Sequence, residues 1–488
     1  MGLMHQLGGL LQLYVNVKNI VRQLSMLAVL FVLIGGAGCA TEPTGTSKNS
    51  NSIANTNAKR AEPATPAPAP ATVTAPANLQ PVTLPILDAF FAQENFASEL
   101  KSKLQLTDDQ VNKLKSIARQ ETAKLREGNE QDQSTGKATA ARERAYTETK
   151  AAIGEEKTQQ LVAFINERWS GDGTAATPPS GASPAGPNAI PSDRRVVVNS
   201  PAFRMDVFED GKLIKSYKIG IGYPEFPLPS GLRKADTIIF NPTWTPPDEP
   251  WVESPNSKVK VGEKVAAGDK LNPLGPIKIP IGLPSLIHGG KAPSKLGTFA
   301  SHGCVGLTSP QVQDFAKRLA QLSGTEISEQ QIAEYQKNKT ETKPVKLSKP
   351  VPVELRYETI TVEDGKLHIY RDVYERGTNT DENLNKVLQT YGVTLDQLSP
   401  DIRAQVTQGL KLMARDAGGK PVSEGADSPS SPKGKGSSAS GAVTRTIKGG
   451  KEVVIEIPAL AGKGYPAPVD LDAGVAAKKP APSPRRRK

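Results

Sequence analysis

Hydrophobic positions follow a helical period in the N-terminal part of the chain. Thr107 and Gln110 have the spacing of a capping box, and apolar side chains then recur three or four positions apart. The apolar positions are Val111, Leu114, Ala118 and Leu125 in one predicted helix and Leu161, Phe164, Ile165 and Trp169 in another. We therefore expect an α-helical region over residues 82–170.

Beyond a linker rich in Gly, Pro, Ala and Ser at residues 171–191, the apolar period changes to two. Alternating runs flank Asp210-Gly211 and Asp364-Gly365, and such pairs between alternating runs are strong hairpin signals. Ser309, followed by Pro310, is the predicted N-cap of one amphipathic helix. A shorter helical patch covers residues 328–336. The pattern predicts a mainly β domain with a few helices over residues 192–378.

The remaining segments carry weaker patterns. Residues 379–416 are expected to form a small helical segment, and residues 417–488 a mostly disordered basic tail with an isolated strand at 453–458. Residues 39–81 are rich in Ser, Thr, Ala and Pro, and they cannot bury enough apolar surface to offset their ordering entropy. They are predicted to be a disordered tether. The protein is therefore expected to be multidomain, with flexible linkers between its folded parts.

The N-terminus has the features of an export signal. Basic residues precede an apolar run at 26–34 that is shorter than the roughly 20 residues needed to span a bilayer. Small residues then lead directly to Cys39, which resembles a bacterial lipoprotein signal. The resemblance implies removal of residues 1–38 and lipidation of Cys39. Because Ala40 follows, it also implies a periplasmic protein anchored in the outer membrane of a Gram-negative bacterium. An ordinary secretory signal with an incidental cysteine is the alternative.

Charge adds one constraint on partners. The formal net charge is +11, and the chain ends in Arg485-Arg486-Arg487-Lys488. In an exported protein such a tail favours anionic lipid, lipopolysaccharide or wall polymer over nucleic acid. We expect no nucleic-acid binding, and a merely solvated tail is the alternative.

Candidate chemistry lies at the second of the two cysteines, Cys304. With Cys39 assigned to the N-terminus, Cys304 cannot form an intramolecular disulfide in the mature chain. A thiolate is a nucleophile, and a neighbouring imidazole can take up its proton. The run Ser301-His302-Gly303-Cys304, with His288-Gly289 upstream, is therefore a candidate site for cysteine acyl transfer.

The choice of base stays open between two histidines on these grounds. His5 lies in the removed signal, and His368 lies on a predicted strand, where a structural role is the default. His288 and His302 remain. Backbone N–H groups around Gly303 and Cys304 are candidate oxyanion donors. A zinc site of two histidines and one cysteine lacks a second cysteine or a suitably placed acidic ligand, so we expect no metal.

The run Ile287-His288-Gly289-Gly290, followed by Ser301-His302-Gly303-Cys304-Val305, resembles the catalytic motif of the YkuD-type L,D-transpeptidases. The segments beginning at Asn241-Pro242 and at Asn272-Pro273 resemble the same family, and the likeness extends over about 195–376. It implies that Cys304 is the nucleophile and His288 the general base. The carbonyl of Gly289 would orient the imidazole, and Ser301, His302 and Gly303 would line the site.

The resemblance implies attack on the amide between residues three and four of a peptidoglycan tetrapeptide stem, with release of D-Ala. The acyl group would pass to an amine of a neighbouring stem, forming a 3→3 crosslink, or to another acceptor. No metal or organic cofactor is implied. The sequence departs from the family at Gly306, where Arg is usual, and glycine cannot supply the planar hydrogen bonds of a guanidinium.

Two alternatives are weighed against this interpretation. A catalytically impaired wall-binding or envelope-stress lipoprotein is suggested by Gly306 and by Leu106-Thr107-Asp108-Asp109-Gln110. That run resembles the motif of Spy- and CpxP-type periplasmic proteins, although a helical spacer or docking hairpin without chaperone activity is the preferred explanation. Papain-like and NlpC-type peptidases place the cysteine before the histidine, whereas here His288 precedes Cys304.

Overall fold

The computed structural model describes residues 82–93, 95–124, 138–169, 186–246, 252, 257–282, 285–422 and 444–471. The predicted signal at 1–38, Cys39 with the tether, and the basic chain end lie outside these residues, as does most of the linker at 171–191. No described helix combines the length and the apolar character needed to cross a membrane.

Helices α2 to α6 pack around one apolar core in the predicted helical region. The predicted capping box is confirmed, because the Thr107 amide donates to Gln110 Oε1 at 3.1 Å and the Gln110 amide to Thr107 Oγ1 at 3.2 Å. The ring of Phe96 stacks on that of Phe164 at the centre of this core. The helices are α2 (Leu84–Phe91), α3 (Phe96–Leu104), α4 (Asp108–Lys124), α5 (Ala138–Ile153) and α6 (Glu155–Trp169).

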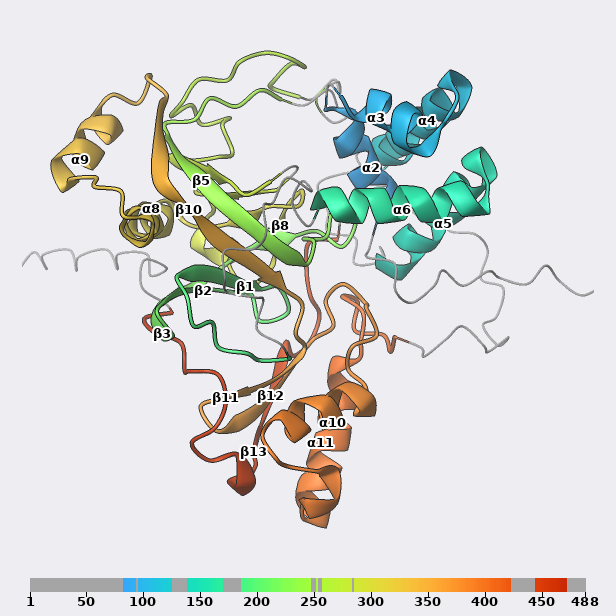
Figure 1. The fold of residues 1–488 in the computed structure, drawn as a ribbon, viewed down its shortest axis with the longest axis vertical. Helices are drawn as coiled ribbons and strands as arrows, with labels where there is room; N and C mark the ends of the chain where they lie inside the picture. The colour runs from blue at the N-terminus through green and yellow to red at the C-terminus, as the bar shows by residue number, and fades with distance from the viewer. Residues whose placement is uncertain are drawn as a thin grey trace, which may run out of the picture. The chain divides into compact units, whose positions relative to one another are not determined.

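The central region is mainly β, as predicted. Its principal sheet has eight strands in the order β3-β2-β1-β10-β5-β6-β7-β9. The pairs β1–β10 and β7–β9 are parallel, and the other neighbours are antiparallel. Figure 1 shows the long strands β5 and β10 side by side. The strands are β1 (Arg195–Asn199), β2 (Arg204–Glu209), β3 (Lys212–Lys218), β5 (Gly231–Phe240), β6 (Ile277–Pro280), β7 (Leu286–His288), β9 (Val305–Gly306) and β10 (Lys343–Arg356).

Both predicted Asp-Gly hairpins are confirmed. Asp210 and Gly211 join β2 to β3 with φ of 50° and 84°, and Asp364 and Gly365 make the same turn with φ of 47° and 77°. Two consecutive positive φ angles give a type I′ turn, whose twist matches that of the flanking strands.

One face of the principal sheet is covered by α8 (Ser309–Ser323), which packs on β6 and β10. Its N-cap is Thr308 and not the predicted Ser309, because Thr308 Oγ1 accepts from the Gln311 amide at 3.3 Å and Gln311 Oε1 accepts from the Thr308 amide at 3.0 Å. This reciprocal pair decides where the helix begins. The remaining elements here are β4 (Ile221–Gly222), which pairs with β8 (Phe299–Ser301), η1 (Pro293–Lys295) and α9 (Glu329–Lys337).

The C-terminal segments form a small sheet packed against helices, which corrects the prediction of an isolated strand. The predicted isolated strand pairs with β12, with Leu367 opposite Ile455, and so lies in a three-stranded sheet of order β11-β12-β13. The predicted small helical segment packs on this sheet around a shared core (Figure 1). A lone strand would leave its backbone groups unpaired, and pairing with β12 supplies their partners. The elements are β11 (Ile360–Glu363), β12 (Lys366–Tyr370), α10 (Asp381–Thr390), η2 (Leu395–Gln397), α11 (Pro400–Met413), β13 (Glu452–Glu456) and η3 (Pro458–Leu460).

Candidate active site

The register of β7 and β9 brings the candidate residues together. Ile287 lies opposite Val305, and His288 lies opposite Gly306. Ile287 and Val305 are buried in the main core. Because successive strand residues point to opposite faces, the His288 side chain lies on the face turned away from that core. Cys304 directly precedes β9, so the two motif segments meet on adjacent strands.

A fixed turn presents the cysteine. Ser301 ends β8, and its Oγ donates to the Cys304 carbonyl oxygen at 2.6 Å while accepting from the Cys304 amide at 3.0 Å. Gly303 has φ of 88°, a conformation that glycine adopts without steric penalty. The sequence suggested the Cys304 amide as an oxyanion donor, but this amide already donates its hydrogen bond to Ser301 Oγ.

Close backbone contact supports this turn from the other side. A Cβ added to Gly222 would lie 3.1 Å from the Gly303 Cα and 2.1 Å from the Phe226 carbonyl oxygen. The Tyr374 hydroxyl donates to the Gly222 carbonyl at 3.0 Å. The glycine at 222 therefore lets one loop lie directly against the turn that carries the cysteine.

The ring of His302 lies against two aromatic side chains of the loop that follows Gly222. Its exposed ring lies edge-on to Tyr223, with centroids 5.1 Å apart, and to Phe226, at 4.7 Å. The Tyr223 amide donates to the Ser301 carbonyl at 2.9 Å, which links the loop after Gly222 to the turn that carries Cys304. His302 therefore lines the surface beside Cys304.

The imidazole of His288 is buried and oriented by a backbone carbonyl. Its Nδ1 lies 2.8 Å from the Gly289 carbonyl oxygen. A carbonyl can only accept, so the neutral ring donates from Nδ1 and keeps its lone pair on Nε2. Burial and the charge of Lys291 lower the pKa of His288 to about 3, against hydrogen bonds to the backbone of Gly289 and Leu274. The ring is therefore neutral at pH 7 and able to accept a proton.

The other segments that carry the family resemblance shape the backbone behind His288. The Asn272 side chain donates to the Pro242 carbonyl at 2.8 Å. A Cβ added to Gly275 would lie 2.4 Å from the Gly290 amide nitrogen. The Asn241 side chain donates to the Asn338 carbonyl at 3.0 Å. These residues brace loops and do not provide reacting groups.

The Cys304 thiol is half-buried and unbridged. Burial raises its pKa, whereas a backbone hydrogen bond from Leu286 and the charge of Lys291 lower it. Among the described residues, no hydrogen bond joins Cys304 Sγ to the His288 ring. The site therefore holds a neutral thiol and a neutral imidazole at pH 7. Such contacts are commonly long in unliganded enzymes and tighten in the substrate complex.

Lys291 lies beside the site and was not predicted from the sequence. The ammonium of Lys291 donates to the Ala300 carbonyl at 2.8 Å. A Cβ added to Gly306 would lie 2.8 Å from Lys291 Cγ. The lysine side chain thus occupies the space beside the position where the resemblance implies an arginine. A single lysine in a polar loop has no distinguishing pattern, so no sequence signal pointed to it.

Other candidate positions lie on different elements. His368 Nδ1 is 2.6 Å from Glu452 Oε1 across β12 and β13. In the part of the chain that the structure describes, no group of three His, Cys, Asp or Glu residues is arranged to hold a metal ion.

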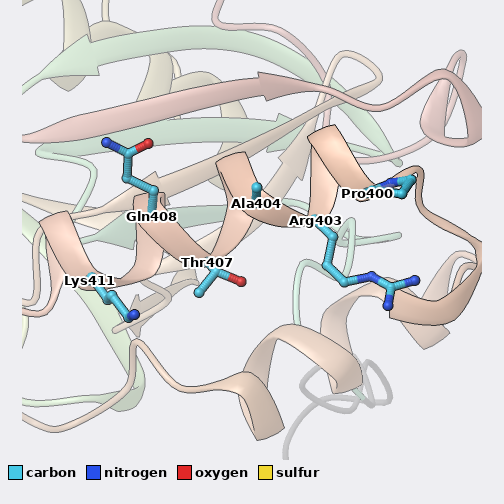
Figure 2. Close-up of a pocket in the computed structure, with 6 residues that line it drawn as sticks. All are labelled: Pro400, Arg403, Ala404, Thr407, Gln408 and Lys411. Atoms are coloured by element: carbon cyan, nitrogen blue, oxygen red, sulfur yellow. The ribbon is translucent and has the colours of Figure 1, made fainter.

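Figure 2 shows a pocket on α11. This helix is not one of the elements that carry Cys304 and His288. The residues that line the pocket are Pro400, Arg403, Ala404, Thr407, Gln408 and Lys411.

Comparison with known proteins agrees with the motif. Residues 193–352 match the family model described as YkuD, the L,D-transpeptidase catalytic domain. No curated protein matches the sequence. A solved L,D-transpeptidase from Mycobacterium smegmatis is 15% identical with a TM-score of 0.20, covering 33% of this chain and 58% of that one.

Two further solved structures are similar over the same share of the chain. The NMR structure of the catalytic domain of the E. faecium L,D-transpeptidase is 16% identical, with a TM-score of 0.22, and covers 34% of this chain and 98% of that one. L,D-transpeptidase 3 from Mycobacterium tuberculosis, with a faropenem-derived adduct, is 17% identical, with a TM-score of 0.19, and the coverage is 33% and 60%.

The chain thus spans just over half the length of the M. smegmatis structure. The family match lies inside the predicted mainly β domain and includes both His288 and Cys304. Residues 193–352 of this chain are a YkuD-type L,D-transpeptidase catalytic domain.

Proposed function

We propose that this protein is a cysteine acyltransferase that forms a thioacyl-enzyme at Cys304 with a peptidoglycan tetrapeptide stem. It releases D-Ala and transfers the acyl group to an amine, giving 3→3 crosslinks or attachment to another acceptor. The observation that carries the proposal is the pairing of β7 with β9 inside a matched L,D-transpeptidase domain. Cys304, with its half-buried thiol, directly precedes β9, and β9 pairs with the strand that ends in the neutral, oriented imidazole of His288.

The chemistry follows from the protonation states. His288 Nε2 takes the proton from the Cys304 thiol, and the thiolate attacks the carbonyl carbon of the third stem residue. The tetrahedral adduct collapses as the imidazolium gives its proton to the leaving D-Ala nitrogen, so the amide breaks and a thioester forms. An acceptor amine then attacks the thioester and loses a proton to His288, and the thiol is regenerated.

The proposed location rests on the N-terminal sequence. Cys39 would carry a lipid anchor after removal of residues 1–38, placing the protein in the periplasm at the outer membrane. Globomycin, which blocks lipoprotein signal cleavage, should then leave an unprocessed precursor. An unchanged mature mass in treated cells would exclude the anchor.

Muropeptide analysis of purified sacculi tests the activity. Sacculi incubated with the protein should gain 3→3 dimers and release D-Ala, and Cys304→Ala should do neither. His368→Gln is the matched control, since it removes a histidine paired with Glu452 on a different sheet and should keep the activity. Equal dimer formation by Cys304→Ala would refute the assigned nucleophile.

A catalytically impaired wall-binding lipoprotein is the second candidate. It is favoured by the raised pKa of the Cys304 thiol and by the lack of a described hydrogen bond from Sγ to His288. In that case the helical region that contains residues 106–110 would contribute more of the function. The resemblance of these residues to Spy- and CpxP-type motifs stays a prediction. Tetrapeptide binding without any adduct on Cys304 would support this candidate.

A further inference from the structure

We propose that Lys291 supplies the positive charge of the catalytic centre, and that Gly306 lacks a side chain so that the Lys291 stem can lie beside the Cys304 turn. In this role Lys291 is a positioning residue that favours the thiolate of Cys304. The inference rests on the proposed function, because it concerns the nucleophile of that reaction.

Packing at Gly306 is the first support. A Cβ built on Gly306 would lie 2.8 Å from Cγ, 3.3 Å from Cδ and 2.9 Å from Cε of Lys291. Real Cβ atoms do not approach other carbons so closely, so any side chain at position 306 would displace the lysine stem. The two positions thus share one space, which Lys291 fills.

Backbone hydrogen bonds fix where the lysine starts. The Lys291 amide donates to the Leu307 carbonyl at 3.0 Å, and the Leu307 amide donates to the His288 carbonyl at 2.9 Å. Gly306 itself exchanges two backbone hydrogen bonds of 2.9 Å with Gly220. The loop after β7 is therefore held along β9, and the Lys291 side chain has to leave it next to Gly306.

The far end of the lysine is also held. Its Nζ donates to the Ala300 carbonyl at 2.8 Å, one residue before the turn that begins at Ser301. Among the described residues no carboxylate pairs with this half-buried ammonium. An ammonium held by one neutral carbonyl keeps its full charge available to an anion forming nearby. The anion that the proposed reaction forms here is the Cys304 thiolate.

The electrostatics agree with this geometry. The charge of Lys291 lowers the pKa of Cys304, and the thiol in turn raises the pKa of Lys291 against its burial. Lys291 also lowers the pKa of His288, which keeps the base neutral. Two other cations lie on neighbouring elements, Lys278, registered opposite His288, and Lys295, which acts on Lys291. Of these three lysines, Lys291 is the one whose charge lowers the Cys304 pKa.

The test is the pH dependence of iodoacetamide alkylation of full-length protein, followed on the Cys304 peptide by mass spectrometry. Lys291→Met should raise the midpoint by about one pH unit, a usual shift for loss of one nearby charge. The rate near pH 7 should then fall about threefold, because the thiolate fraction falls about tenfold while the more basic thiolate reacts about threefold faster.

Companion variants separate charge from folding. Gly306→Ala should displace Lys291 and raise the midpoint similarly, and adding Lys291→Met to it should raise it little further. Lys291→Arg keeps the charge and should stay near the wild-type midpoint. Lys295→Met, the control for loss of one cation in the same loop, should leave the midpoint unchanged. If Lys291→Met does not fold, the alkylation midpoint of Gly306→Ala provides the test instead.

An unchanged midpoint in folded Lys291→Met or in Gly306→Ala would overturn the inference, as would an equal shift in Lys295→Met. The measurement needs no stem peptide, so it is independent of the proposed activity. If the midpoints shift as expected but no stem peptide acylates Cys304, the proposed function fails and the role of Lys291 in ionising the thiol stands. If acylation occurs and the midpoints do not move, only this inference fails.

Discussion

The hydroxyl of Ser301 holds both backbone polar groups of Cys304, donating to its carbonyl at 2.6 Å and accepting from its amide at 3.0 Å. One side chain therefore sets the conformation of the residue that carries the thiol. Gly303 completes the turn with a positive φ that other residues adopt only with strain. The position of the sulfur is thus fixed by the motif residues themselves.

Ser301→Ala should lower the free energy of unfolding by about 1–3 kcal/mol, because two partly buried backbone groups of Cys304 lose their partner. It should also slow acylation of Cys304 about tenfold or more, since the sulfur is no longer held in place. Urea unfolding and the rate of adduct formation measure the two effects. Ser301→Thr keeps the hydroxyl and should retain most of the rate, and an equal loss in both variants would contradict the assigned role.

His288 should make stability fall on acidification. Its folded pKa of about 3 lies below the ordinary 6.5, so between these values the unfolded chain takes up a proton that the folded protein does not. The free energy of unfolding should therefore fall as the pH drops from about 6.5 towards 3. Between about pH 7 and about pH 4.5 this contribution amounts to roughly 2–3 kcal/mol.

The comparison with His288→Asn isolates that contribution. Asparagine keeps a donor for the Gly289 carbonyl but does not titrate in this range. Wild-type protein should lose more stability than His288→Asn over the same pH interval in urea unfolding. Identical losses would show that the imidazole is not held neutral by burial.

Gly222→Ala should destabilise the protein and disturb the turn that carries Cys304. Its Cβ would meet the Phe226 carbonyl oxygen at 2.1 Å and the Gly303 Cα at 3.1 Å, and backbone atoms cannot rotate out of the way. We expect a loss of about 1–3 kcal/mol or more in thermal unfolding, together with slower acylation. Gly262→Ala is the control, because it has φ of 73° with nothing within 4 Å and should cost about 1 kcal/mol without affecting acylation.

Two buried arginines should respond in opposite ways to replacement by methionine. Arg204 pairs with Asp206 and Glu363, so its loss leaves two buried carboxylates and should cost about 3–5 kcal/mol. Arg233 donates to the Gly282 carbonyl at 3.0 Å, but its Nε and Nη2 find no acceptor among the described residues, and burial lowers its pKa to about 9. Its replacement should be neutral or stabilising in urea unfolding, and a loss as large as that of Arg204 would show an unrecognised partner.

Local signals in the sequence predicted the elements that depend on neighbouring residues alone. The Asp210-Gly211 and Asp364-Gly365 turns and the capping box at Thr107 are each decided within four positions, and all three were confirmed. The cysteine and histidine motif segments were found for the same reason, because their residue types and spacing are themselves the signal. Their meeting on β7 and β9 is a property of the fold.

Features set by distant contacts were missed. The strand at Glu452–Glu456 pairs with β12, far away in the sequence, and nothing local identifies its partner. One local feature was also missed: the start of α8 was misplaced by one residue, because both Ser309 and Thr308 are suitable caps and only the reciprocal hydrogen bonds between Thr308 and Gln311 distinguish them. The sharing of one space by Gly306 and Lys291 depends on how two loops pack, which no spacing rule predicts.

Intact-mass spectrometry of the protein mixed with a tetrapeptide muropeptide measures whether Cys304 accepts an acyl group from a peptidoglycan stem. We expect an adduct with the mass of the stem less D-Ala, mapped to the Cys304 peptide and lost in Cys304→Ala. Release of no D-Ala and no adduct from folded wild-type protein, or the same adduct on Cys304→Ala, would contradict this expectation.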